Sequence, residues 1–183
     1  MRNRAYDLAT YVFQKDEPLL LDTNVWLYLY PAPSDRPTYH AAGYSAALKS
    51  MLAAGSRLIM DAMILSEYLN RYSRIEWNAL HKAVQPDFKA FRKSAEFLSV
   101  GQGAATFARG MLRLCTRRNH PFATADVTRV LADFEAGTND FNDGLLAETC
   151  RHHGWKLVTN DSDFTTGGIE VLTSHPALLR ACT

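Results

Sequence analysis

Four acidic residues, far apart in the chain, stand where a folded protein could use them together. Asp22 interrupts the apolar run LLLDTNVWL, and Asp161 follows the aliphatic segment KLVT after one intervening residue. Glu67 and Asp143 lie in segments whose apolar residues recur with helical spacing. Carboxylates gathered in one apolar crevice repel each other, and divalent metal ions resolve that conflict. Oxygen ligands without nearby His or Cys favour Mg²⁺ or Mn²⁺, which many enzymes use to cleave phosphodiester bonds.

Each acid, taken alone, also has a purely structural interpretation. Asp22 is a suitable N-cap for a helix that follows it, and Asp140 and Asp143 suit the N-cap and first turn of another helix. Asp161 is a common residue type for a turn, and Glu67 could extend past its neighbours to solvent. Only their convergence in the fold would favour the catalytic interpretation over these.

The elements that must position these acids alternate between short aliphatic strands and helices. We expect strands that begin at Leu19 and that cover residues 57–60, 156–159 and 169–173. The expected helices cover residues 5–15, 40–54, 62–77 and 139–153, and the middle of the chain, 78–136, is helix-like throughout. Asp61 is an expected N-cap, and Gly55 and Gly154 are expected to end helices. This alternation indicates an α/β fold with a parallel sheet covered on both faces.

In a parallel sheet of this kind, ligands and catalytic groups lie at the carboxyl ends of the strands. Asp22 and Asp161 both follow strands, so we expect them at the same edge. Glu67 follows Met63 by four residues and Ile64 by three, so it lies on the apolar face of its helix and should point toward the sheet. Asp143 shares a helical face with apolar residues further along its helix and should also point inward.

The composition excludes several classes of protein. The 183 residues fit one domain, and a net charge of +1 gives no overall electrostatic reason to bind nucleic acid, so any basic surface must be local. Three widely spaced cysteines make a zinc site or a disulfide framework a poor interpretation. No signal peptide and no membrane span are apparent, so we expect a cytoplasmic protein.

Together, the segments LLLDTNVWL, MILSEYLNR and DFNDGLLAETCRHHGWKLVTNDSDF resemble the PIN domain ribonucleases, which include VapC-like toxins of bacterial toxin–antitoxin pairs. The resemblance covers residues 19–30, 57–71 and 140–164. It implies an α/β/α fold in three layers around a short parallel sheet, with residues 1–183 forming one domain and a helical insertion at about 76–125. Gly144 departs from the family pattern, which typically has a bulkier residue after this acid.

The resemblance also implies a set of site residues. Asp22, Glu67, Asp143 and Asp161 match the acidic quartet of the family, which is catalytic and would hold one or two Mg²⁺ or Mn²⁺ ions. The accessory positions are Thr23, Asn24, Asp140, Thr159 and Asp163. Arg71 and Arg74 follow Glu67 on the same expected helix and are candidates for contacts to RNA phosphates.

The implied activity is that of a metal-dependent endoribonuclease, a hydrolase that leaves a 5′-phosphate and a 3′-hydroxyl. A toxin of this kind would have an antitoxin protein as its partner and could form a homodimer. One alternative is a PIN fold that only binds another protein. A second is a phosphatase of the haloacid-dehalogenase type, but such enzymes need a second acid two residues after the first, where this chain has Asn24.

Overall fold

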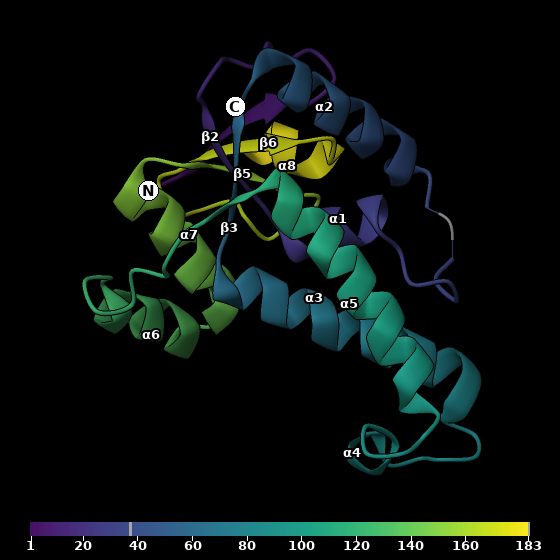
Figure 1. Cartoon of the computed structure of the whole chain (residues 1–183). Coiled ribbons are helices and arrows are strands. Elements are labelled where there is room, and N and C mark those ends of the chain that lie inside the picture. The colour runs from purple at the N-terminus through teal and green to yellow at the C-terminus, as the bar shows by residue number, and fades with distance from the viewer. Residues whose placement is uncertain (37, 183) are drawn as a thin grey trace.

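A parallel sheet forms the centre of the protein (Figure 1). In this computed structural model, which describes residues 1–36 and 38–182, the sheet has six strands in the order β1-β6-β5-β2-β3-β4. The strands are β1 Arg4–Asp7, β2 Pro18–Leu21, β3 Arg57–Met60, β4 Thr116–Arg117, β5 Lys156–Val158 and β6 Glu170–Thr173. Every pairing between these strands is parallel, which confirms the predicted α/β class with a parallel central sheet.

Helices connect the strands and cover the sheet. They are α1 Thr23–Leu29, α2 His40–Ala54, α3 Ala62–Glu76, α4 Phe88–Phe91, α5 Phe97–Leu114, α6 Val127–Glu135, α7 Phe141–His153 and α8 Pro176–Ala181. A π-helical turn, Trp77–His81, continues directly from α3. Figure 1 shows α7 on one side of the sheet and α1 and α2 on the other. Among the described residues, no helix is long and apolar enough to cross a membrane.

The middle of the sheet is fully buried. Leu19, Leu20 and Leu21 of β2 have an exposed fraction of 0%, which fits a central strand with helices on both of its faces. β2 lies between β5 and β3, so the apolar run that precedes Asp22 forms the core of the fold. Burial of these side chains therefore fixes the point at which Asp22 leaves the sheet.

Helix boundaries follow the local signals in the sequence. The Asp61 carboxylate accepts a hydrogen bond of 2.9 Å from the backbone N–H of Ile64 and caps α3. Gly55 and Gly154 adopt left-handed conformations after α2 and α7, where residues with a Cβ would be strained. The predictions for these three helices are therefore confirmed.

The predicted N-terminal helix over residues 5–15 is wrong. Residues Arg4–Asp7 instead form the edge strand β1, in which Tyr6 pairs with Leu172 of β6. The segment that follows is not helical, and Tyr11 and Phe13 pack against the core from it. A strand whose only partner lies about 165 residues further along the chain carries little local signal of its own.

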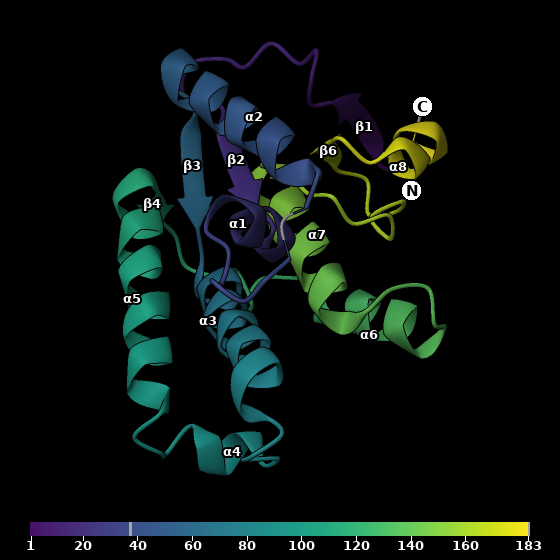
Figure 2. The ribbon, with the colours of Figure 1, turned by 90° about the vertical axis from the view of Figure 1, so that its right-hand side faces the viewer.

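The helix-like middle of the chain is interrupted more often than its pattern indicates. α4 has only 4 residues, and the next helix, α5, begins at Phe97. Leu98, in the first turn of α5, is 65% exposed. The strand β4 was not predicted; it has 2 residues and pairs with the end of β3. We call residues 62–114, which contain α3, the π-helical turn, α4 and α5, the arm. Figures 1 and 2 show α3 and α5 side by side, projecting from the sheet with α4 at the far end.

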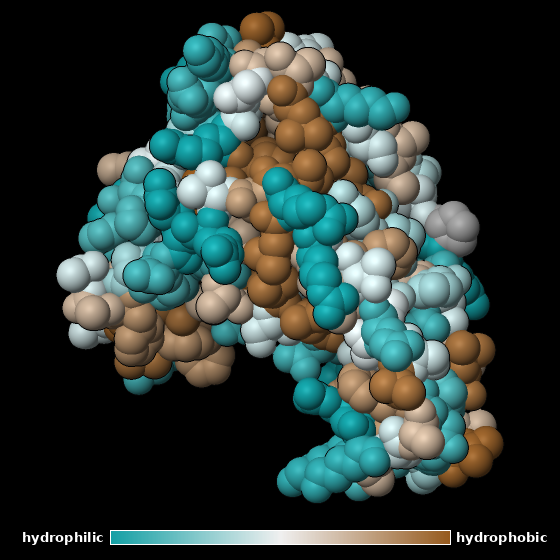
Figure 3. Space-filling model, viewed as in Figure 1, coloured by the Kyte–Doolittle hydropathy of each residue, from teal (hydrophilic) through white to brown (hydrophobic). Residues whose placement is uncertain are grey.

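The surface of the arm is mixed in character. Leu80, Val84 and Leu98 are exposed there, and Figure 3 shows apolar patches on the arm between hydrophilic side chains. The division of the chain into one domain with a helical insertion at 76–125 stays a prediction.

Close packing of α6 against α7 explains the unexpected glycine after Asp143. A Cβ built on Gly144 would lie 2.9 Å from Cγ1 of Val130, which is 4% exposed and belongs to α6. Valine is restricted at χ1, so its methyl group cannot easily move away. Gly144 therefore lets α6 pack against the first turn of α7.

Replacing Gly144 by alanine tests this packing. In an isolated helix the change would stabilise by about 1 kcal/mol. Here we expect Gly144→Ala to destabilise by about 1 to 3 kcal/mol, because the new methyl group overlaps Val130. Urea denaturation measures the difference. Adding Val130→Ala to the Gly144→Ala variant should recover part of the loss, and additivity of the two changes would contradict the packing argument.

Candidate active site

Asp22 lies where β2 ends and α1 begins. Its backbone N–H donates to the carbonyl of Val158 at 2.9 Å, which places it beside the end of β5. Its carboxylate, in a residue only 7% exposed, accepts hydrogen bonds from the backbone N–H of Thr23, the amide of Asn24 and the hydroxyl of Thr159. The carboxylate therefore caps α1, as its structural interpretation predicts, and is also held in place from the neighbouring strand.

Glu67 reaches the same edge of the sheet from α3. Its Oε2 accepts a hydrogen bond of 3.0 Å from the hydroxyl of Thr23, the residue next to Asp22. Its Oε1 lies 3.3 Å from the guanidinium of Arg71, one turn further along the helix. Glu67 thus points toward the sheet, as its position on the apolar face of α3 indicated.

Asp161 follows β5 and is held by its own loop. Its backbone N–H donates to the Thr159 hydroxyl at 3.0 Å, and its carboxylate accepts from the backbone N–H of Asp163 at 3.0 Å. Thr159 therefore connects the Asp22 carboxylate to the backbone of Asp161, and the ends of β2 and β5 share one network. The Asp163 side chain itself is exposed at the rim.

α7 brings two further acids to the site. Asp140 is the N-cap of this helix and accepts a hydrogen bond of 2.8 Å from the backbone N–H of Asn142. Asp143 lies in the first turn and is partly buried. Among the described residues, no hydrogen-bond donor or cation contacts its carboxylate. Asp143 is therefore the least stabilised acid of the group.

The electrostatics show that these acids face one another. Burial raises the pKa of Asp22 to about 6, a rise that the hydrogen bond from Thr159 opposes and the charges of Glu67 and Asp161 reinforce. Burial also raises the pKa of Asp143 to about 7, together with repulsion from Asp22, Asp161, Asp140 and Glu67. Asp22 and Asp143 thus each lie within electrostatic reach of the other three acids of the expected quartet. We call Asp22, Glu67, Asp143 and Asp161 the acidic cluster.

Two open cavities flank the acidic cluster. One of about 530 Å³ lies between α3 and α7 and is lined by Ala62, Met63, Ser66, Glu67, Asn70 and Asn142. The other, of about 280 Å³, is lined by residues 137–140 together with Ser162, Asp163 and Thr165. The first cavity reaches Glu67, and the second is lined by residues that follow Asp161 in its loop.

The chemistry of the acidic cluster fits a hard divalent cation. All of its side-chain donors are carboxylate oxygens, the ligands that Mg²⁺ and Mn²⁺ prefer. Burial and the charges of neighbouring acids raise the pKa values of Asp22 and Asp143, so a bound cation would favour their ionised forms. Within residues 1–36 and 38–182, however, no three His, Cys, Asp or Glu side chains are already arranged to hold one ion. The residues suit the ion by the chemistry of their donor oxygens.

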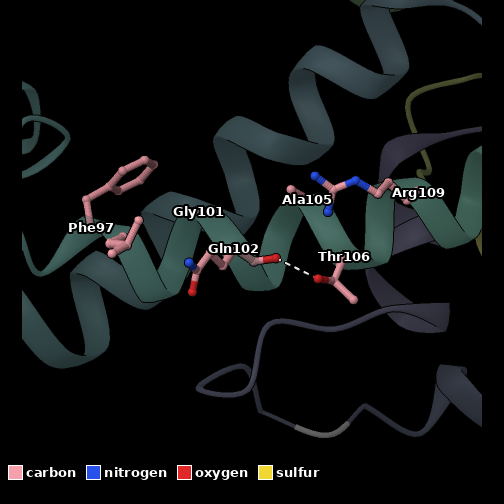
Figure 4. A pocket seen from close by; sticks show the side chains of 7 residues that line it. Phe97, Gly101, Gln102, Ala105, Thr106 and Arg109 are labelled. Atoms are coloured by element: carbon pink, nitrogen blue, oxygen red, sulfur yellow. Dashed lines mark hydrogen bonds between the residues drawn. The ribbon is translucent and has the colours of Figure 1, made fainter.

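Other predicted or notable positions lie further from the cluster. Arg71 lies at the border of the acidic cluster, where it contacts Glu67. The guanidinium of Arg74 instead lies 4.4 Å from the ring centroid of Phe88 on the arm. A separate groove of about 490 Å³ runs along the outer face of α5, where Phe97, Gly101 and Arg109 line it (Figure 4). No member of the acidic cluster lines that groove, so it is not part of this site.

Sequence reasoning missed Asn160. Its backbone N–H donates to the side-chain oxygen of Asn24 at 3.2 Å, and its own amide group contacts the hydroxyls of Tyr28 and Tyr44. Its position between Thr159 and Asp161 was the available signal, but the segment TNDSDF looked like an ordinary turn.

The fold and the site together define the class of protein. It is an α/β protein whose parallel sheet carries acidic side chains at the carboxyl ends of its strands, where they form a candidate active site.

The sequence model of the PIN domain family matches residues 19–168, and the chain belongs to this family. The matched region begins at β2 and contains the whole acidic cluster. Members of the family are generally nucleases. No match was found among curated protein sequences.

Two solved structures are similar to this chain. The structure of VapBC2 from Rickettsia felis, bound to a DNA fragment from their promoter, contains a chain that is 15% identical with a TM-score of 0.54; the alignment covers 85% of this chain and 98% of that one. At this identity the likeness shows the fold alone. The structure of FitAcB from Neisseria gonorrhoeae contains a chain that is 21% identical; the alignment covers 84% of the present chain and 96% of the FitAcB chain. Its TM-score of 0.44 is too low to support a structural conclusion.

Burial of Asp143, together with repulsion from the other acids of the cluster, should make stability depend on pH when no metal is present. Asp143 has a pKa of about 7 when folded and about 3.9 in an unfolded chain. Between these values the folded state binds more protons, so the free energy of unfolding should fall as pH rises from about 4 to about 8. Asp143→Asn should flatten this slope and stabilise the protein at pH 8 by about 1 kcal/mol, allowing for solvent screening.

Thermal unfolding in chelator at several pH values measures the effect. Glu135→Gln is a matched control, because it exchanges the same groups at an exposed position of α6. An equal pH slope for Asp143→Asn and for the wild-type protein would show that the Asp143 carboxylate does not carry this repulsion.

Proposed function

We propose that this protein is a metal-dependent endoribonuclease of the VapC-like toxin type, acting in the cytoplasm. The observation that carries the proposal is the acidic cluster itself. Two of its carboxylates, on Asp22 and Asp143, have pKa values raised by burial and by the charges of neighbouring acids. Clusters that destabilise a fold in this way are typical of functional sites, and membership of the PIN domain family makes nuclease chemistry the natural use.

We assign the metal to Asp22, Glu67, Asp143 and Asp161, as one or two ions of Mg²⁺ or Mn²⁺. When bound, the metal supplies positive charge for the phosphate oxygens and lowers the pKa of the attacking water. The protein supplies the positions of the ligands. Thr23 orients Glu67, and Thr159 and Asn24 orient Asp22 through the hydrogen bonds described above.

The substrate would lie across the acidic cluster and extend into the two flanking cavities. Arg71, with its side chain about half exposed, is the cation best placed to contact a phosphate, since it already borders Glu67. Arg74 is about one turn further along α3, against Phe88 of α4, and would contact the RNA toward the far end of the arm. Asp140 and Asp163 line the cavity on the other side and act as accessory residues that limit how closely phosphates approach there.

A protein partner is part of this proposal. The aligned structure with the higher TM-score is of VapBC2, a complex bound to promoter DNA. By analogy, we propose that this chain binds an antitoxin protein, and that two copies of the chain can associate. A PIN fold that only binds a partner is the alternative function. Metal binding and RNA cleavage separate the two.

Asp22→Asn tests the nuclease mechanism. The change keeps the size of the side chain but removes its charge, so we expect cleavage of single-stranded RNA in Mg²⁺ or Mn²⁺ to fall to background. Wild-type cleavage should leave a 5′-phosphate, and excess chelator should abolish it. Gel analysis of end-labelled RNA measures all three. Titration calorimetry with Mn²⁺ should show weaker binding to the variant than to the wild-type protein.

Glu135→Gln is again the control, and its cleavage rate should match that of the wild-type protein. Unchanged cleavage by Asp22→Asn, or cleavage that persists in chelator, would rule out this mechanism. A wild-type protein that bound no Mn²⁺ and cleaved no RNA would instead support the partner-binding alternative.

A further inference from the structure

Four aromatic rings form a continuous stack that runs from the core to the surface beside α1. The Tyr44 and Tyr28 ring centroids lie 5.5 Å apart, and those of Tyr28 and His40 also lie 5.5 Å apart. The rings of His40 and Tyr39 follow at 3.8 Å. The interplanar angles are 31° to 38°, so each ring is tilted against the next one along this series, which we call the stack.

The inner end of the stack is attached to the candidate active site. The Tyr44 hydroxyl donates to the Thr159 carbonyl at 2.9 Å, and the Tyr28 hydroxyl accepts from the side-chain amide of Asn160 at 3.2 Å. Asn160 in turn bonds to Asn24, which donates to the Asp22 carboxylate. The stack and the acidic cluster therefore share the residues at the end of β5, and their relative positions are fixed.

The outer end of the stack is open. Tyr44 is 1% exposed, whereas Tyr39 is 87% exposed and contributes little burial to the fold. A cavity of about 280 Å³ lies beside Tyr28, at the start of α2. The residues that line it are Leu27, Tyr28, Pro31, Ala32, Pro33, Asp35, Arg36, Thr38 and Ala41. An exposed ring near a cavity with a mainly apolar lining, in which Arg36 and Asp35 carry opposite charges, offers a face for stacking and space beside it.

The geometry of α1 sets the distance between the stack and the Asp22 carboxylate. Asn24 and Tyr28 are one turn apart on α1, which rises about 6 Å over four residues. The stack thus begins about one helical turn away from the Asp22 network. Aromatic side chains stack on the unpaired bases of single-stranded RNA without strong sequence preference.

We propose that Tyr39 and His40, supported by Tyr28, form a stacking platform for a nucleobase of the RNA strand that enters or leaves the acidic cluster, with the adjacent cavity receiving the base. This inference rests on the proposed function and specifies how that site holds its substrate. The platform fixes the strand by its bases on one side of the scissile phosphate. It selects for single-stranded RNA, because paired bases are not free to stack on a protein ring.

Binding of a short oligoadenylate that contains 2-aminopurine tests the platform. The measurement uses the full chain at low ionic strength with Ca²⁺ in place of Mg²⁺, and it records fluorescence anisotropy and quenching of the 2-aminopurine. We expect Tyr39→Ala and His40→Ala to weaken binding about 5-fold or more and to lose the quenching that reports stacking. Tyr39→Phe should keep both. Phe122→Ala removes another exposed aromatic ring and should bind as the wild-type protein does.

The outcomes distinguish a failure of the stacking platform from a failure of the proposed nuclease function. Normal binding and quenching by Tyr39→Ala and His40→Ala, with a wild-type protein that binds and cleaves RNA, would overturn the platform and leave the proposed function standing. A wild-type protein that neither binds nor cleaves RNA would overturn both. Thermal unfolding and sedimentation of the variants serve as controls. Weaker binding that accompanied a change in oligomeric state would assign Tyr39 to a contact between copies, against the platform.

Discussion

Repulsion between carboxylates at one edge of a buried sheet is the constraint on which this structure depends. Asp22 and Asp143 sit in surroundings that favour their neutral forms, and the charges of Glu67 and Asp161 increase that preference. The fold tolerates the cost because the core beneath it is deeply buried and because hydroxyl, amide and backbone donors surround Asp22. In the proposed function, a dication would offset the remaining cost, and the repulsion that weakens the metal-free protein would then contribute to affinity for metal.

The parallel sheet is what turns distant acids into neighbours. β2 and β5 are adjacent, so the residues that follow them must meet, and Thr159 joins them by contacting both Asp22 and the backbone of Asp161. The two helices that complete the site come from opposite directions. α3 contributes Glu67 from the base of the arm, and α7 contributes Asp143 from its first turn. Gly144 belongs to this arrangement, because it allows α6 to support α7 closely at that turn. The space between α3 and α7 is a cavity that reaches Glu67, and the proposed substrate would enter there.

The proposed recognition combines local positive charge with aromatic stacking, a combination that suits a single-stranded substrate. Net charge is only +1, so long-range attraction to nucleic acid is weak, and the acidic cluster by itself would repel phosphates. In the proposed function, recognition of RNA would therefore depend on local cations such as Arg71 and on contacts to the bases. The stack from Tyr44 to Tyr39 is anchored to the same residues that orient Asp22, so a base held there would have a defined position relative to the acids.

The sequence by itself determined those features that depend on neighbours along the chain. Helical spacing placed Glu67 on the inward face of α3, Asp61 and the two glycines marked helix ends, and aliphatic runs marked the strands that precede Asp22 and Asp161. Tertiary structure alone decided the rest. β1 and the two-residue β4 exist only because β6 and β3 offer them partners, so no local period predicts them. The reason for Gly144 lies in Val130 on another helix, and the role of Asn160 lies in tyrosines more than a hundred residues away. Capping and periodicity act over a few residues, whereas close packing and side-chain networks form only after the chain has folded.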